Sequence, residues 1–244
     1  MKRFLVLPIS LLAVPAVLRA DPIPVVITVD DGLKTGLTIM APAFEKRGWR
    51  GTYNIVTDSI GKPACLTWDD VRELVRRGHS VTTHTKSHAN LGKLAQVGKT
   101  DVLRTEIAVS ADRIERETGV RPHYLCLPWG VGGPEVDRIA ASCGLETFAV
   151  RREVCGKCSP AGTDRGPKAV IGRRIAEGAR AVDLMIHGVT PAGGGYEAFE
   201  TVSDFESFLD EVAACTNAVV TDYRTAQNAL GRKIVSQQSG GAGR

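Results

Sequence analysis

The sequence predicts one α/β domain, a parallel (β/α) barrel. Short apolar runs rich in β-branched residues alternate with helical segments along the chain, as in a sheet built from βαβ units. The polar residues with the most chemistry follow directly after these runs, where the carboxyl ends of barrel strands meet. The 244 residues suffice for one domain of this kind.

Seven strands are predicted from these runs. The run Ile23–Val29 is almost wholly apolar, as expected for a strand that is buried on both faces. The full set of predicted strands is 23–29, 52–56, 79–83, 124–127, 147–150, 182–186 and 218–221.

Helices are predicted between the strands. Thr67 is expected to cap one of them, with Asp70 three residues on and Gly78 after its end. The other predicted helices span 35–47, 101–118, 134–142, 203–214 and 225–230. Residues 153–180 are predicted to form a long loop with a short strand or turn near Val170 and Ile171. Residues 188–200, with three consecutive glycines, are predicted to form a flexible loop beside a cleft.

Residues 1–20 have the pattern of a secretory signal peptide. Lys2 and Arg3 precede an apolar run that is shorter than a membrane span, and Ala20 suits a cleavage point. An uncleaved anchor is the alternative. Removing this segment takes three basic residues and no acidic one, so the formal charge falls from +4 to +1. We therefore expect a secreted or periplasmic protein that binds no nucleic acid and has no stable membrane span once the signal is removed.

The expected domains are thus a signal peptide at 1–20, a catalytic domain at 21–234 and a disordered tail at 235–244. All six cysteines lie in the catalytic domain, and an even number in an exported protein favours disulfides. The pairing stays open among 15 alternatives, with Cys155 and Cys158 as the one local candidate pair. Oligomeric state is not predicted.

Three strand ends carry residues that suit a metal site. Asp30 and Asp31 end the first strand, His84 and His88 follow the third, and His187 follows the sixth. Two imidazoles four residues apart can reach one divalent cation, and a carboxylate completes a three-ligand site that leaves positions for water and substrate. Taken alone, the histidine pair favours a structural role over a metal site, and the carboxylates and His187 at neighbouring strand ends change that balance. His79 and His123 have no partner motif and are assigned structural roles.

Four segments together resemble the polysaccharide deacetylases, the group with NodB homology that forms carbohydrate esterase family 4. The resemblance covers residues 23–230. It is carried by Thr28-Val29-Asp30-Asp31-Gly32, His84-Thr85-Lys86-Ser87-His88, Leu127-Pro128-Trp129-Gly130 and Met185-Ile186-His187. It implies a distorted (β/α)7 barrel and the removal of N- or O-linked acetyl groups from a polysaccharide or oligosaccharide.

The resemblance also implies a role for each matching residue. Asp30 would be the general base and His187 the general acid. The metal ligands would be Asp31, His84 and His88, which hold a divalent metal, expected to be Zn²⁺ with Co²⁺, Ni²⁺ or Mn²⁺ as alternatives. The segment Pro128-Trp129 would present a backbone N–H to the oxyanion, and Met185 would line the acetyl pocket.

The sequence departs from the family pattern at two places. Cys126 stands where the family has an arginine that pairs with the base, and no aspartate that would orient His187 follows Val150. We hypothesise that Arg151 supplies the missing cation from the neighbouring strand; the alternative is a solvated loop charge.

Two other functions remain open. One is a metal-independent amidase of the same superfamily that acts on a small substrate. The other is a non-catalytic carbohydrate- or metal-binding pseudoenzyme. Retention of the complete ligand set disfavours the first, and retention of Asp30 and His187 disfavours the second. The sequence does not identify the acetylated sugar.

Overall fold

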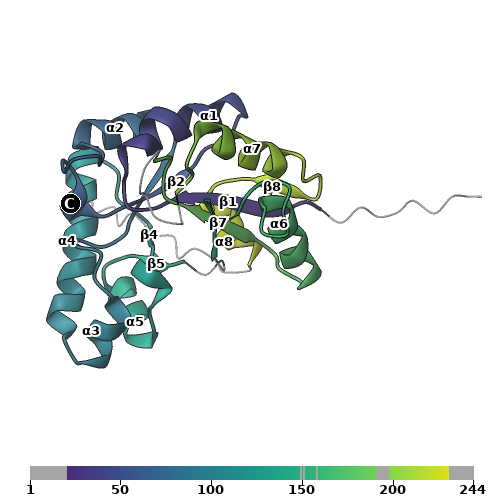
Figure 1. Cartoon of the computed structure of the whole chain (residues 1–244). Coiled ribbons are helices and arrows are strands. Elements are labelled where there is room, and N and C mark those ends of the chain that lie inside the picture. Colours follow the sequence, from purple (N-terminus) through teal and green to yellow (C-terminus); the bar gives the residue numbers. More distant parts are fainter. Residues whose placement is uncertain (1–20, 149, 151, 158, 191–197, 231–244) are drawn as a thin grey trace, which may run out of the picture.

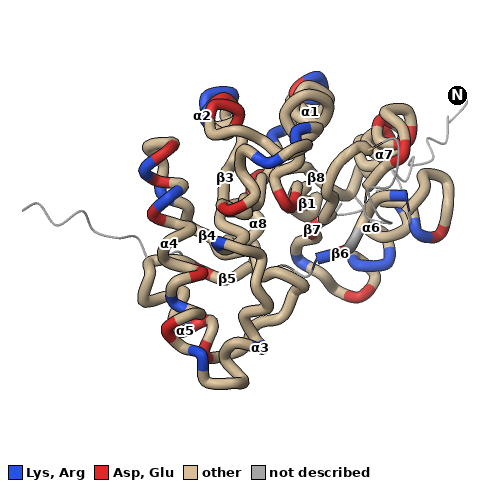
Figure 2. The backbone as a smooth tube through the Cα atoms, turned by 60° about the vertical axis from the view of Figure 1, so that its left-hand side comes forward, with Lys and Arg blue, Asp and Glu red and all other residues tan. Residues whose placement is uncertain are grey.

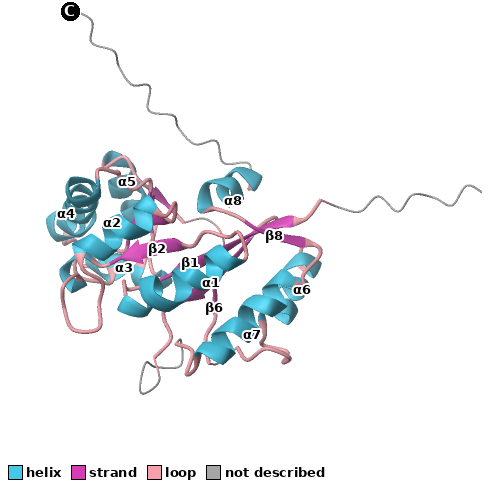
Figure 3. Ribbon diagram, turned by 90° about the horizontal axis from the view of Figure 1, so that it is seen from above, coloured by secondary structure: helices cyan, strands magenta, loops and turns pink. Residues whose placement is uncertain are grey.

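The protein, a computed structural model, is described for residues 21–148, 150, 152–157, 159–190 and 198–230. Its strands form one sheet, and helices cover the outer face of that sheet, whereas the last helix packs through Tyr223 and Ala226 against Val26 on the other face (Figures 1 and 3). The strands are β1 (Ile23–Val29), β2 (Thr52–Ile55), β3 (Ser80–Thr83), β4 (Tyr124–Leu125), β5 (Glu146–Thr147), β6 (Arg152–Val154), β7 (Val182–Ile186) and β8 (Ala218–Val220). The α-helices are α1 (Ala41–Lys46), α2 (Trp68–Arg76), α3 (Leu91–Gln96), α4 (Thr100–Thr118), α5 (Pro134–Ser142), α6 (Pro167–Ala176), α7 (Val202–Ala213) and α8 (Tyr223–Ala229).

The predicted parallel (β/α) barrel is confirmed. Every pair of strands in the sheet is parallel, and the strand order is β5-β4-β3-β2-β1-β7-β6. β8 lies off this path and pairs with the first residues of β1. No pairing joins β5 to β6 within the described part of the chain, so the curled sheet stays open between these strands.

The two faces of the strands carry different side chains. In β1, Val25, Ile27 and Val29 belong to the main hydrophobic core beneath the helices. Because successive side chains of a strand point to opposite faces, Thr28 and Asp30 point into the barrel. In β7, the same alternation places Asp183 and Met185 on the inner face. The barrel interior is therefore polar where these strands end.

Helix ends follow the predicted signals. Thr67 accepts a hydrogen bond from the backbone of Asp70, and the Asp70 carboxylate accepts one from the backbone of Thr67, so the predicted cap is a capping box. α4 ends at Gly119, whose positive φ of 74° suits a residue without a side chain. Residues of both charges mix along α2, α4 and α5 (Figure 2), where several form ion pairs within one helix turn.

The prediction for residues 153–180 is wrong. The segment contains α6, which begins directly after Gly166 with Pro167 at its first position, and Val170 and Ile171 are buried within this helix. The weak apolar periodicity concealed it, although a proline at the first position is itself a helix-start signal. The strand predicted at 147–150 is also wrong in extent, because pairing stops at Thr147 and resumes with β6.

Several predictions lie outside the described residues. These are the signal peptide at 1–20, the tail at 235–244 and residues 191–197, which make up most of the loop predicted at 188–200. No disulfide joins any two of the five described cysteines, and Cys158 is not among the described residues. Within the described ranges, no helix has the length and apolar character required to cross a bilayer.

Candidate active site

The predicted metal ligands come together at the carboxyl ends of β1 and β3. The Nε2 atoms of His84 and His88 are 3.2 Å apart. Asp31 Oδ1 lies 3.7 Å from Nε2 of His84 and 3.5 Å from Nε2 of His88. Ligand atoms of the three residues all lie within 4.8 Å of one another, which is the spacing of donors around a single cation.

These residues fit a divalent metal. Asp31 Oδ1 is buried and has no hydrogen-bond partner among the described residues. Nδ1 of His84 is 2.8 Å from the carbonyl oxygen of Cys126, so Nδ1–H donates to that oxygen and Nε2 keeps its lone pair for a ligand. Burial lowers the pKa of His84, which favours the neutral form that binds metal.

The loop of residues 84–88, which carries both histidines, is shaped by two residues with strained backbone angles and by contacts with α4. Thr85 and His88 have positive φ angles of 69° and 65°. Thr85 Oγ1 accepts a hydrogen bond from the backbone N–H of His88, which closes the turn between the two histidines. The buried Glu106 carboxylate accepts from the backbone N–H of Ser87 at 2.8 Å and from its hydroxyl at 2.7 Å. Glu106 thus anchors the loop that presents both imidazoles.

Asp30 is the other carboxylate of this site and is almost completely buried. Its Oδ1 accepts from Asn54 Nδ2 at 2.6 Å and from Arg152 Nη2 at 2.7 Å. Its Oδ2 accepts from Arg152 Nη2 at 2.8 Å and lies 3.5 Å from Nε2 of His84. Burial would raise the pKa of Asp30, but the guanidinium of Arg152 is the largest of the opposing causes, which together lower the pKa to about 2.

The cation beside Asp30 is Arg152. Sequence analysis assigned this place to Arg151, which lies outside the described residues. Among the described residues, the cation that pairs with Asp30 is thus Arg152 of β6, and the role predicted for Arg151 stays a prediction. Arg152 Nη1 also donates to the sulfur of Cys126, the residue at the position of the family's arginine.

Two buried polar residues of this interior were missed by sequence analysis. Asp183 has no exposed surface and lies within the apolar run of β7. Burial raises the pKa of Asp183 to about 6, although Arg152 opposes this rise. Asn54 lies in β2 and accepts a hydrogen bond from the hydroxyl of Thr82 at 2.5 Å. A polar residue at an inward position of an otherwise apolar strand was the only signal for either.

The remaining predicted residues surround the same site. His187 follows β7, with its Nε2 3.8 Å from Asp31 Oδ2. Met185 lies two residues earlier and is 9% exposed. Pro128 is buried and Trp129 is 71% exposed with a positive φ of 61°. The Trp129 ring stands edge-on to His88 at 5.0 Å between centroids, so this segment forms one side of the site.

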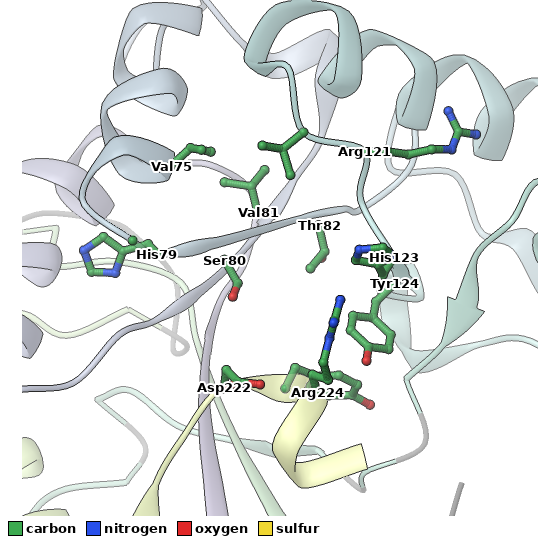
Figure 4. A pocket seen from close by; sticks show the side chains of 13 residues that line it. Val75, His79, Ser80, Val81, Thr82, Arg121, His123, Tyr124, Asp222 and Arg224 are labelled. Carbon is green, nitrogen blue, oxygen red and sulfur yellow. The ribbon is translucent and has the colours of Figure 1, made fainter. Parts of the chain in front are cut away.

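His79 and His123, assigned structural roles, lie at the opposite ends of the strands. His79 is buried, accepts from the backbone N–H of Gly51 and contacts Glu45 at 2.9 Å. Both histidines line a cavity of about 440 Å³ at the starts of β3 and β4, beside Asp222 and Arg224 (Figure 4). None of the metal ligands lines it, so this cavity is separate from the candidate active site.

Comparison with protein families gives one match. Residues 19–148 match the family model described as polysaccharide deacetylase. No curated protein sequence matches the chain.

Solved structures share the fold at low sequence identity. A family 4 acetyl xylan esterase from Clostridium thermocellum, in complex with a cobalt ion, has a TM-score of 0.62 and 17% identity, covering 86% of this chain and 93% of its own. The Xyl-CE4 domain of a multidomain xylanase from the hindgut metagenome of Trinervitermes trinervoides has a TM-score of 0.60 and 12% identity, with coverage of 88% and 94%. A CE4 family pseudoenzyme from Bacillus anthracis has a TM-score of 0.57 and 16% identity, with coverage of 83% and 64%.

Proposed function

Because the chain belongs to the polysaccharide deacetylase family, we propose that it hydrolyses acetyl groups from a polysaccharide or oligosaccharide in a metal-dependent reaction. The observation that carries this proposal is the convergence of Asp31, His84 and His88 beside a second, ionised carboxylate, Asp30. A hydrolase that activates water needs ligands that hold a metal ion and a separate base that takes a proton from the water, and these four residues provide both.

Asp31, His84 and His88 would hold the metal. When bound, a divalent cation lowers the pKa of a water molecule and polarises a carbonyl oxygen. Two imidazoles and one carboxylate suit Zn²⁺, and Co²⁺, Ni²⁺ or Mn²⁺ can use the same donors. The cobalt ion in the Clostridium thermocellum esterase supports a divalent metal in this fold.

Asp30 is the proposed general base. Asn54 and Arg152 both donate to Oδ1, whereas Oδ2 receives one arginine contact and faces His84. Oδ2 is therefore the oxygen with the capacity to accept a proton from water. The arginine keeps the carboxylate ionised, so that the base is ready at neutral pH.

His187 is the proposed general acid, and its Nε2 lies 3.8 Å from Oδ2 of the metal ligand Asp31. It would donate a proton to the departing amine or hydroxyl of the sugar. The backbone N–H of Trp129 is proposed to donate to the oxyanion after the water attacks, and Met185 to contact the acetyl methyl group. These roles follow from the resemblance, and the positions of the residues around one site support them.

A non-catalytic, carbohydrate-binding function is the second candidate. The observation that favours it is Cys126, which replaces the family's arginine, together with a pseudoenzyme among the similar structures. Arg152 weakens this alternative, since it restores a cation at both oxygens of Asp30. A metal-independent amidase is disfavoured by the complete set of ligands.

The test is acetate release from a panel of acetylated xylan, chitooligosaccharide, poly-N-acetylglucosamine and peptidoglycan. The protein is assayed after loading with zinc or cobalt and again after treatment with a chelator. We expect acetate release from at least one substrate, its loss with chelator and its return with metal. Release that is unaffected by chelator would support the amidase, and metal binding without release from any substrate would support the binding protein.

We also propose that the protein is exported and loses residues 1–20. The basic start followed by a short apolar run supports this. Mass spectrometry of the protein purified from its native cells would show a mature form that begins at Asp21 if the proposal is right.

A further inference from the structure

We infer that Asp183 is a positioning residue, which fixes the guanidinium of Arg152 against the base Asp30. This inference deepens the proposed function and rests on it. Among the described residues, the side-chain hydrogen bonds of Asp183 join it to Thr28 and Arg152 and to none of the metal ligands, so it would act through Arg152.

The contacts of Asp183 join three strands. Arg152 in β6 and Asp183 in β7 are directly paired in the sheet. Asp183 Oδ2 accepts from Arg152 Nε at 3.2 Å, and Oδ1 accepts from the hydroxyl of Thr28 in β1 at 2.7 Å. The Thr28 oxygen in turn accepts from Arg152 Nη2 at 3.1 Å. Arg152, Asp183 and Thr28 therefore form a closed ring of hydrogen bonds.

The ring determines where Arg152 points. A guanidinium is planar, with its donors fixed relative to one another, so holding Nε determines the direction of the other two nitrogens. With Nε on Asp183 and Nη1 on the sulfur of Cys126, Nη2 is directed at both oxygens of Asp30. In the family pattern the arginine comes from the motif that here carries Cys126. An arginine entering from another strand needs a different anchor, and Asp183 supplies it.

Charge and burial support the same role. Arg152 is the only cation in this ring, and it lies between two carboxylates, Asp30 and Asp183, that have almost no exposed surface. A second carboxylate is costly to bury unless it is paired. Thr28 and Arg152 together satisfy both of its oxygens. A residue needed only to fill space at this position would be apolar, as Met185 on the same face of β7 is.

The test combines Asp183→Asn with Arg152→Ala and the double variant. Asn has nearly the same shape as Asp, but it carries no negative charge and has only one acceptor oxygen. It therefore cannot accept hydrogen bonds from Thr28 and from Arg152 Nε on two separate oxygens, as Asp183 does. We expect Asp183→Asn to lower kcat by about 10-fold to 100-fold, the usual effect of losing a supporting partner. KM and the affinity for Zn²⁺ should change by less than about 2-fold, because neither substrate nor metal ligand is touched.

The double variant separates positioning from a purely structural role. If Asp183 acts through Arg152, adding Asp183→Asn to Arg152→Ala lowers kcat no further. If the two effects multiply, or if Asp183→Asn alone leaves kcat unchanged, the inference is wrong. Asp112→Asn, on the exposed face of α4, is the matched control and should retain full activity.

A crystal structure of Asp183→Asn keeps this inference separate from the proposed function. Should the wild-type protein release no acetate, the proposed function fails, but the position of Arg152 can still be measured. Loss of the contacts between Arg152 Nη2 and both Asp30 oxygens would support the inference. An unmoved guanidinium in a folded variant would overturn it.

Discussion

Asp30 and Asp31 are adjacent carboxylates with different surroundings. Asp30 points into the barrel and is neutralised by Arg152, whereas Asp31 has a positive φ of 69° that turns its side chain toward the histidines. A non-glycine residue in this conformation is strained, and strain of this kind is concentrated at functional sites. The backbone conformation thus directs two adjacent aspartates to different roles, Asp30 to that of the proposed base and Asp31 to that of a proposed metal ligand.

The first prediction concerns His187→Ala. An amine is a poor leaving group without a proton, whereas an alkoxide leaves more easily, so loss of the acid should harm amide hydrolysis more than ester hydrolysis. We expect kcat to fall about 10²-fold or more on an N-acetylated sugar and clearly less on an O-acetylated one.

Steady-state assays on the two substrates, at one metal concentration, check this. His123→Ala, at the opposite ends of the strands, is the control and should match the wild-type protein. Equal losses on amide and ester would remove His187 from the role of proton donor.

The residues that bear chemistry were predictable because each follows a run with strand character. Asp30, Asp31, His84, His88 and His187 were identified in this way. Arg152 was not identified, because the sequence alone does not determine the register of β6 and so does not show which of its side chains face inward. Asp183 was missed because the run around it gives no sign of which face is polar.

At the scale of elements, α4 supports the loop that carries the histidines. The second prediction is that Glu106→Ala weakens Zn²⁺ binding by about 10-fold to 100-fold, the range typical of losing a residue that orients metal ligands. The reason is that Glu106 holds both the backbone and the hydroxyl of Ser87, between the two ligands.

Zinc titration by calorimetry measures this effect. Glu115→Gln, an exposed substitution on the same helix, serves as the control. Wild-type affinity in the Glu106 variant would show that the loop holds its shape without α4.

The third prediction concerns the contacts between α1, α2 and β3. Hydrogen bonds from Arg77 are the largest cause that lowers the pKa of Glu45, to about 2, and His79 contributes. Because the folded state binds this proton more weakly than the unfolded chain, the stabilisation is present above the unfolded pKa of about 4.5 and is lost as the pH falls toward 2.

Glu45→Gln should therefore lower the free energy of unfolding at pH 7, and the difference from wild type should shrink between pH 4.5 and pH 2. Urea denaturation across this range provides the measurement. A difference that stays constant with pH would mean that the charge of Glu45 does not contribute.

Element types were predictable where periodicity was strong, as in α4, and failed where it was weak, as in α6. The segment before α6 is rich in glycine and charged residues, which gave no local sign that a helix follows. We infer that packing of α6 against α7, rather than local sequence preference, stabilises this helix.

At the scale of the whole molecule, the parallel sheet directs the ends of β1, β3 and β7 to one side, where the chemistry gathers. β6 is the edge strand beside the opening of the sheet between β5 and β6, and its Arg152 points into the polar interior, where it pairs with Asp30. Fold class was predictable from the alternation of strands and helices. The incomplete closure was not, because it depends on pairings between edge strands.

The central claim is that Asp31, His84 and His88 bind one divalent cation next to Asp30. Anomalous diffraction at the zinc absorption edge, from crystals grown with zinc, tests it directly. The account predicts one strong peak about 2.0–2.2 Å from an Asp31 oxygen and from one nitrogen of each histidine. A zinc-soaked crystal with no peak between these three side chains would contradict it.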